Sequence, residues 1–182
     1  TTGSNNVAIG SSALETHTTG EKNIAIGYGA MNDTDAGSNS LDSDRNVFIG
    51  YDSGGGTWAN TKSENNVAIG SYTMDSALDG ATHNTAVGDN ALSSITTGDN
   101  NVMLGSGTGD GITTGSDNVF IGMDAGNATT DVDKAVIIGS SSASADMTSG
   151  ADGTVGIGYD ALNALTSGAE NVIVSRDAGY SI

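Results

Sequence analysis

A short apolar phrase recurs along the chain and constrains its fold more than any other feature. It reads NNVAIGSSAL at residues 5–14 and returns as KNIAIGYGAM at residues 22–31 and as NNVAIGSYTM at residues 65–74. The glycines that close successive copies are most often 17 residues apart. A fixed period of this size indicates a solenoid in which each repeat forms one coil. The repeat glycines are Gly10, Gly27, Gly50, Gly70, Gly88, Gly105, Gly122, Gly139 and Gly158, with Ser175 in the tenth slot.

The residues before each repeat glycine have the alternation of a short β-strand. Val7 and Ile9 are two residues apart, so their side chains face the same side of a strand. Aliphatic, mostly β-branched residues hold these two positions in the other copies as well, and only Thr85 interrupts the columns. The glycine supplies a corner, and a second small element follows at Ala13–Leu14 and its equivalents. The pattern predicts an all-β, parallel β-solenoid of about ten coils with two short strands per coil, roughly 45–50 Å long.

An asparagine precedes the first strand position in eight of the ten copies. One interpretation is a polar stripe that binds a ligand. The favoured interpretation is a structural ladder, in which side-chain amides stack and form hydrogen bonds between coils at a turn. The asparagines are Asn6, Asn23, Asn46, Asn66, Asn84, Asn101, Asn118 and Asn171.

The residue between the two aliphatic positions is apolar too, as in Ala8, Phe48 and Phe120. Strands that are apolar on both faces are buried on both sides, whereas one thin coil has a single interior. The other face would then be an apolar stripe that a soluble monomer rarely tolerates. We therefore expect a homo-oligomer with cyclic symmetry. The sequence leaves open which of the two faces meets the partner.

Composition excludes several classes of function. The chain has 28 Gly, no Pro, no Cys and a formal net charge of −17. Such acidity disfavours binding to nucleic acid or to an anionic membrane surface. The lack of cysteine excludes a disulfide framework and thiolate chemistry. Since the chain begins at Thr1 and enters the repeat at once, we expect residues 1–182 to be a single repeat domain within a longer fibre chain.

The repeated phrase carries a resemblance to two kinds of fibrous protein. The motif N-x-V-A-I-G-x-x-A resembles the head domains of trimeric autotransporter adhesins, and the longer form T-T-G-x-x-N-V-A-I-G-x-x-A-L resembles repeat segments of phage tail fibres. The resemblance covers essentially all of residues 1–182. It implies a left-handed β-roll in an intertwined or side-by-side homotrimer, with an extracellular structural and adhesive role rather than an enzymatic one. The 17-residue period favours a virion fibre, with a bacterial adhesin head as the alternative.

Two insertions are the best guide to a ligand-binding site. They fall at about residues 32–45 and 53–65, in consecutive coils, and loops on a rigid scaffold often carry function. An aromatic patch with basic groups there would suit a cell-surface glycan. Alternatively, the tryptophan covers its own loop or packs on a neighbouring subunit. The candidate residues are Trp58, Tyr28, Tyr51, Arg45 and Lys62.

Catalytic and metal-binding signals are sparse. We identify no arrangement of acid, base and nucleophile, although a carboxylate pair formed between chains remains open. The stretch GTGDGI at residues 107–112 resembles one calcium-binding β-roll repeat and makes Asp110 a lesser metal candidate. Because the pattern occurs once, we expect no metal and no cofactor. An ice-binding solenoid is a further alternative, based on the Thr-Thr pairs, but the insertions break the flatness that it requires.

Overall fold

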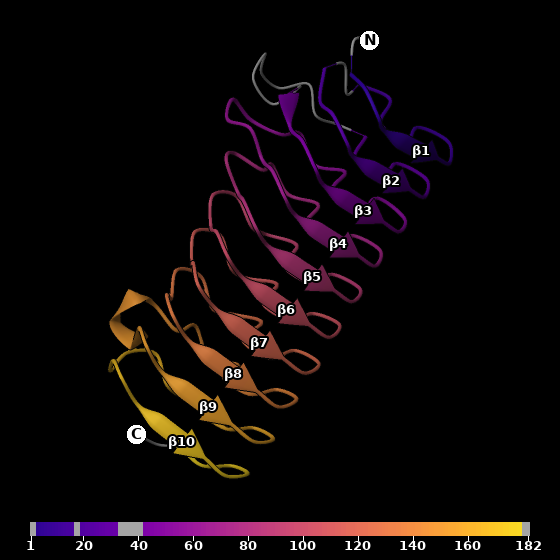
Figure 1. Ribbon diagram of the computed structural model, residues 1–182. Helices are drawn as coiled ribbons and strands as arrows, with labels where there is room; N and C mark the ends of the chain where they lie inside the picture. Colours follow the sequence, from indigo (N-terminus) through magenta and orange to yellow (C-terminus); the bar gives the residue numbers. More distant parts are fainter. Residues whose placement is uncertain (1–2, 17–18, 33–41, 180–182) are drawn as a thin grey trace.

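The computed structural model describes residues 3–16, 19–32 and 42–179. Ten parallel strands form one sheet, and strands that follow one another in the chain are neighbours in space (Figure 1). The predicted all-β, parallel β-solenoid is therefore confirmed. The strands are β1 (Val7–Ile9), β2 (Ile24–Ile26), β3 (Val47–Ile49), β4 (Val67–Ile69), β5 (Thr85–Val87), β6 (Val102–Leu104), β7 (Val119–Ile121), β8 (Val136–Ile138), β9 (Val155–Ile157) and β10 (Val172–Val174); the short 3-10 helix η2 (Ser149–Ala151) precedes β9.

The pairing register is the same in every coil. Thr85 of β5 pairs with Val102 of β6, and Val87 pairs with Leu104, as their equivalents do in all nine strand pairs. Coils of different length therefore keep their strands aligned, and each of the three strand positions forms a column along the rod.

The structure settles which strand face is the interior. From β2 to β9 the middle residue is buried, and the first and third residues are half-buried or exposed. The large middle residues Phe48, Met103 and Phe120 are fully buried in the core. The aliphatic first and third positions consequently form an outer face.

The second strand expected in each coil is absent from the described residues, and this part of the prediction is wrong. The Ala-Leu segment forms a turn, because its second residue has a left-handed backbone. Leu14, Leu92 and Leu162 have φ of 54°, 54° and 60°. Their side chains nevertheless point inward, and Leu92 and Leu162 are fully buried. A parallel strand cannot continue through residues with positive φ, so within the described residues each coil contributes one strand.

The asparagines form a hydrogen-bonded ladder. Asn101 donates its backbone N–H and its side-chain amide to Oδ1 of Asn84, both at 3.0 Å, and a second amide bond to the Gly115 carbonyl at 2.8 Å. Its own Oδ1 accepts the equivalent pair from Asn118 at 3.1 Å. Each amide thus satisfies backbone groups of a turn that no strand pairing reaches. Six members are fully buried: Asn23, Asn46, Asn66, Asn84, Asn101 and Asn118.

Many of the acidic residues also serve the backbone. Asp99 Oδ1 accepts hydrogen bonds from the Thr82 N–H at 2.6 Å and the Thr82 hydroxyl at 2.9 Å. Asp133 likewise accepts from the Ser116 N–H at 2.7 Å, one coil earlier. Carboxylates bind amide N–H groups more strongly than neutral acceptors do. Part of the negative charge of the chain is therefore used to connect coils at their turns.

Candidate functional site

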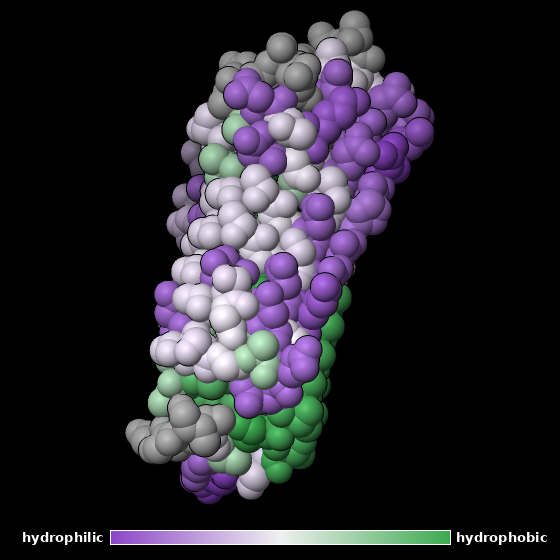
Figure 2. Space-filling view, turned by 90° about the vertical axis from the view of Figure 1, so that its left-hand side faces the viewer, coloured by the Kyte–Doolittle hydropathy of each residue, from purple (hydrophilic) through white to green (hydrophobic). Residues whose placement is uncertain are grey.

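The exposed apolar residues gather on one side of the rod. All the large hydrophobic side chains that are exposed in the described residues belong to the outward strand positions or to the two positions after the repeat glycine. Figure 2 shows part of this surface as a green band at the right-hand edge, over the C-terminal coils. The residues are Val7, Ile9, Tyr28, Tyr51, Ile69, Tyr72, Val102, Leu104, Met123, Tyr159, Val172 and Val174.

We call the outward residues of the ten strands the strand face. It comprises the first and third residue of each strand, and every one of these residues is aliphatic except Thr85. The strand face carries no charge, although the chain has 22 acidic residues and 5 basic residues. Leu104 is 48% exposed and Ile9 is 58% exposed. An uncharged aliphatic stripe of this length is typical of a surface that is covered by a protein partner.

The column that follows the repeat glycine borders the strand face and is mixed in character. It holds Asp89 and Arg176 as well as Tyr28, Tyr51 and Tyr159. The guanidinium carbon of Arg176 lies 5.4 Å from the centre of the Tyr159 ring, a cation–π contact. Charged residues in this column indicate a rim rather than the centre of an interface.

Three tyrosines on this border form what we call the tyrosine row. Tyr28 and Tyr51 stack with ring centres 5.4 Å apart, and Tyr51 meets the edge of Tyr72 at 5.3 Å. All three are exposed. The structure thus brings together the predicted pair Tyr28 and Tyr51. Tyr72 was missed because it follows Gly70 by two residues rather than one.

Trp58 does not belong to this surface. It is fully buried, its ring centre lies 5.5 Å from that of Phe48, and its indole N–H donates to the Gly54 carbonyl at 3.2 Å. A glycan cannot stack on Trp58, because neither face of its ring is exposed. Trp58 packs against its own coil instead. The insertion at residues 53–65 therefore supplies a core residue. Most of the other insertion, residues 33–41, lies outside the described residues.

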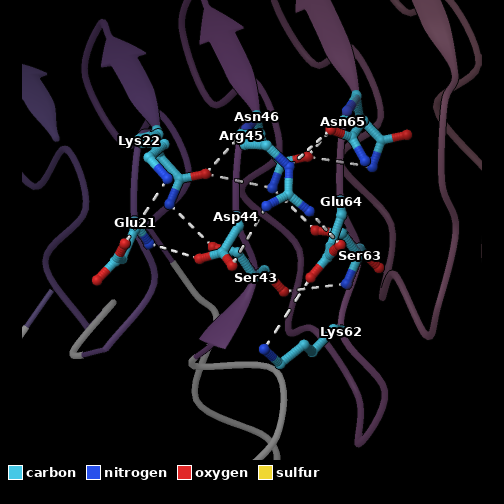
Figure 3. A network of polar contacts seen from close by, with 12 residues as sticks. Glu21, Lys22, Ser43, Asp44, Arg45, Asn46, Lys62, Ser63, Glu64 and Asn65 are labelled. Atoms are coloured by element: carbon cyan, nitrogen blue, oxygen red, sulfur yellow. Dashed lines mark hydrogen bonds and ion pairs between the residues drawn. The ribbon is translucent and has the colours of Figure 1, made fainter. Parts of the chain in front are cut away.

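Arg45 and Lys62 are also apart from the tyrosine row. Arg45 precedes β3 whereas Tyr51 follows it, so the two lie at opposite ends of the strand. Both basic groups are engaged by Glu64 (Figure 3): Arg45 at 2.6 Å and Lys62 at 4.0 Å. Arg45 also donates to Asn65 Oδ1 at 2.9 Å. Arg45 connects neighbouring coils, Lys62 pairs within its own coil, and the predicted five-residue patch is not assembled.

The acidic candidate Asp110 sits in a hydrogen-bonded turn. Its Oδ1 accepts a bond from the Ser93 hydroxyl of the preceding coil. Within the described residues, no three His, Cys, Asp or Glu side chains are grouped so as to hold a metal ion. The charge of Asp110 also affects Asp75, which lies one coil beyond Ser93. Desolvation, together with the charges of Asp52 and Asp110, raises the pKa of Asp75 to about 6.

The two hydroxyls of the threonine pairs at residues 96–97 and 113–114 have different surroundings. The Thr96 hydroxyl donates to the Thr113 carbonyl at 2.9 Å, and the Thr113 hydroxyl donates to the Thr130 carbonyl at 3.3 Å. The neighbouring Thr97 and Thr114 are exposed. In these two pairs the first threonine therefore links coils and only the second is exposed, so each of these coils offers a single outward threonine.

Comparison with known proteins adds no relative. The chain matches no protein-family model, no characterised protein and no solved structure. Among the described residues, no helix has the length and apolar character needed to cross a bilayer. The strand face and the tyrosine row are therefore the features from which a function can be inferred.

Proposed function

We propose that the chain is a structural and adhesive segment of a homotrimeric extracellular fibre. A virion fibre is the first candidate and a bacterial surface adhesin head is the second. The observation that carries the proposal is the strand face, which runs along all ten strands without a charged residue. Covering this stripe removes apolar area from water, at about 25 cal/mol per Å².

A second copy of the same chain is the partner that best fits the strand face. The columns repeat once per coil at a spacing of about 4.8 Å, so a partner that covers their whole length needs the same repeat. Another copy of the chain has the same repeat because its sequence is the same. The charges of the chain lie outside the strand face, so three copies can meet there without bringing like charges together. Closed cyclic symmetry covers the stripe on every chain.

The adhesive part of the proposal rests on the tyrosine row. Because the row lies on the rim, trimer formation leaves it accessible. Three copies of one weak site would give polyvalent attachment to a cell surface, and exposed aromatic rings next to carboxylates such as Asp52 suit the ring faces and hydroxyls of a surface glycan. Tyr51→Ala should then reduce binding of the trimer to a glycan array, while Tyr159→Ala, in the same column but outside the row, should leave binding unchanged. Equal binding by both variants and the parent would contradict this role.

Light scattering after size exclusion tests the assembly. We expect a mass of three 18.0 kDa chains. Leu104→Asp would place a carboxylate on the strand face and should yield a folded chain of lower mass. Ser106→Asp is the matched control, because the equivalent rim position one coil earlier is already Asp89. A parent chain that is folded and monomeric would overturn the proposal.

A further inference from the structure

A trimer built from near-identical coils faces a problem of register. The strand face repeats the same aliphatic shape in every coil, and the pairing register within the chain is uniform. Sliding one chain by one coil relative to its partner would place aliphatic residues against aliphatic residues again. Apolar surfaces with a short repeat specify register weakly. Something other than the aliphatic columns must distinguish the aligned trimer from the slipped one.

Thr85 is the one polar residue on the strand face. It occupies the first position of β5, between Val67 of β4 and Val102 of β6. It is half-buried, and its hydroxyl has no hydrogen-bond partner among the described residues. Its backbone N–H, in contrast, donates to the Asn101 carbonyl at 2.8 Å. The hydroxyl is therefore free to bond outside its own chain.

We propose that Thr85 fixes the register and the parallel alignment of the three chains. The inference rests on the proposed homotrimer. In the aligned trimer the three Thr85 hydroxyls meet near the three-fold axis, and each donates to the next, which satisfies all three. A slip by one coil places each hydroxyl against Val67 or Val102 of a partner, where it has no partner group. Polar residues in apolar interfaces specify register in this way.

The other features that could set the register are weaker. The tyrosine row and the Tyr159–Arg176 pair lie on the rim, in or next to the column that contains Asp89. Rim contacts remain hydrated and contribute little to binding. Thr85 lies in a column that is otherwise wholly aliphatic, where loss of a hydrogen bond is most costly.

Disulfide trapping tests the register directly, since the chain has no cysteine of its own. Val102→Cys chains and ¹⁵N-labelled Val119→Cys chains, one coil apart, are refolded together and oxidised. An aligned trimer forms disulfides only between identical chains, because a bridge requires Cβ atoms about 4 Å apart. A trimer slipped by one coil forms mixed disulfides, which mass spectrometry identifies by their half-labelled mass.

We expect few mixed disulfides with Thr85 present. In the Thr85→Val background the yield of mixed disulfides should increase roughly tenfold, because loss of one buried hydroxyl partner changes an equilibrium by about this factor. Moving the hydroxyl to another coil, in Thr85→Val with Val67→Thr (β4) or with Val136→Thr (β8), should restore identical-chain disulfides. A trimer without disulfides between identical chains, or with unchanged products after Thr85→Val, would overturn the inference while leaving the trimer intact. A monomer by light scattering would overturn the proposed function itself.

Discussion

Phe120 and Gly126 share one space in the core. A Cβ atom on Gly126 would lie 2.3 Å from Cε2 of Phe120. The backbone conformation alone does not require glycine at this position. The φ of Gly126 is 61°, and leucine or methionine occupies the same left-handed position in other coils. Gly156 and Leu162 have the reverse relationship, because a Cβ on Gly156 would lie 2.2 Å from Cδ1 of Leu162. Each coil thus places one large residue either on the strand or in the turn six residues later.

This compensation predicts a strong coupling between the two positions. Phe120→Ala should cost about 3–5 kcal/mol through the cavity it leaves, and Gly126→Leu should cost about 1–3 kcal/mol or more through overpacking. The double variant converts the coil to the Ala-and-Leu arrangement found around β5, with Ala86 and Leu92. Urea unfolding at fixed protein concentration should show it to be more stable than either single variant. Additive losses would contradict shared space.

The asparagine ladder predicts a large cost for a small truncation. Asn101→Ala removes an acceptor of two bonds from Asn118 and leaves the buried Gly115 carbonyl without its donor at 2.8 Å. Each unsatisfied buried group costs about 1–3 kcal/mol, so the thermal midpoint should fall by many degrees. Asn171→Ala is the control, because Asn171 is only half-buried and its amide donates to Gly168 of its own turn. Equal losses for both variants would exclude a special role for the ladder.

The carboxylate at Asp99 predicts a graded effect. Asp99→Ala removes the acceptor for both the N–H and the hydroxyl of Thr82, which should cost about 1–3 kcal/mol since the acceptor is charged. Asp99→Asn keeps a side-chain oxygen in place and should retain a large part of this stability. Chemical denaturation of the two variants is the measurement. Identical losses would mean that the hydrogen bonds contribute nothing and that charge alone matters.

Asp75 predicts a stabilising substitution that depends on pH. Its pKa of about 6 in the folded chain lies above the ordinary value of 3.8, so the folded chain binds the proton more tightly than the unfolded chain. Ionised Asp75 therefore lowers stability above pH 6, and this penalty vanishes as the pH falls toward 3.8. Asp75→Asn should raise the melting temperature at pH 7.5, with a gain that shrinks by pH 4.

Asp117→Asn controls for the loss of one negative charge, because Asp117 is exposed and asparagine tolerates its φ of 61°. Melting curves of both variants and the parent chain between pH 4 and pH 8 give the comparison. A gain at Asp75 that is the same at every pH would argue against burial of the ionised carboxylate as its cause.

The strand positions were predictable because they depend on a period-two alternation that recurs in every coil. Val7 and Ile9 identify the strand, and the glycine after them identifies its end. The ladder was predictable for the same reason, since Asn101 and its equivalents keep one position relative to that glycine. Repetition turns weak local signals into a firm prediction of fold.

The turn after the glycine was not predictable from the same reasoning. Ala91–Leu92 has the composition of a short strand, but the φ of Leu92 is 54°, a conformation that no propensity of leucine indicates. Such left-handed positions recur along the described coils, and proline cannot occupy them because its ring fixes φ near −65°. Packing of Trp58 on its own loop was one of two alternatives that the sequence left open, and its full burial agrees with that alternative.

A signal for the core packing was nevertheless present. Phe48 and Phe120 are each followed six residues later by glycine, whereas Ala68 and Ala86 are followed at the same distance by methionine and leucine. Comparing these two columns across coils shows that their sizes vary inversely. Period-two alternation is judged from each column by itself. It therefore does not reveal that the size of the middle strand residue depends on the size of the residue six positions later.

The sequential order of the sheet has a consequence for how such a protein changes over time. Each strand touches only the strands before and after it in the chain, so the cross-section does not depend on how many coils there are. An in-frame duplication or deletion of 17 codons, the most common spacing, lengthens or shortens the rod by about 4.8 Å. The distance that the protein spans can thus evolve in whole-coil increments, and each increment changes contacts only at the coils where it occurs.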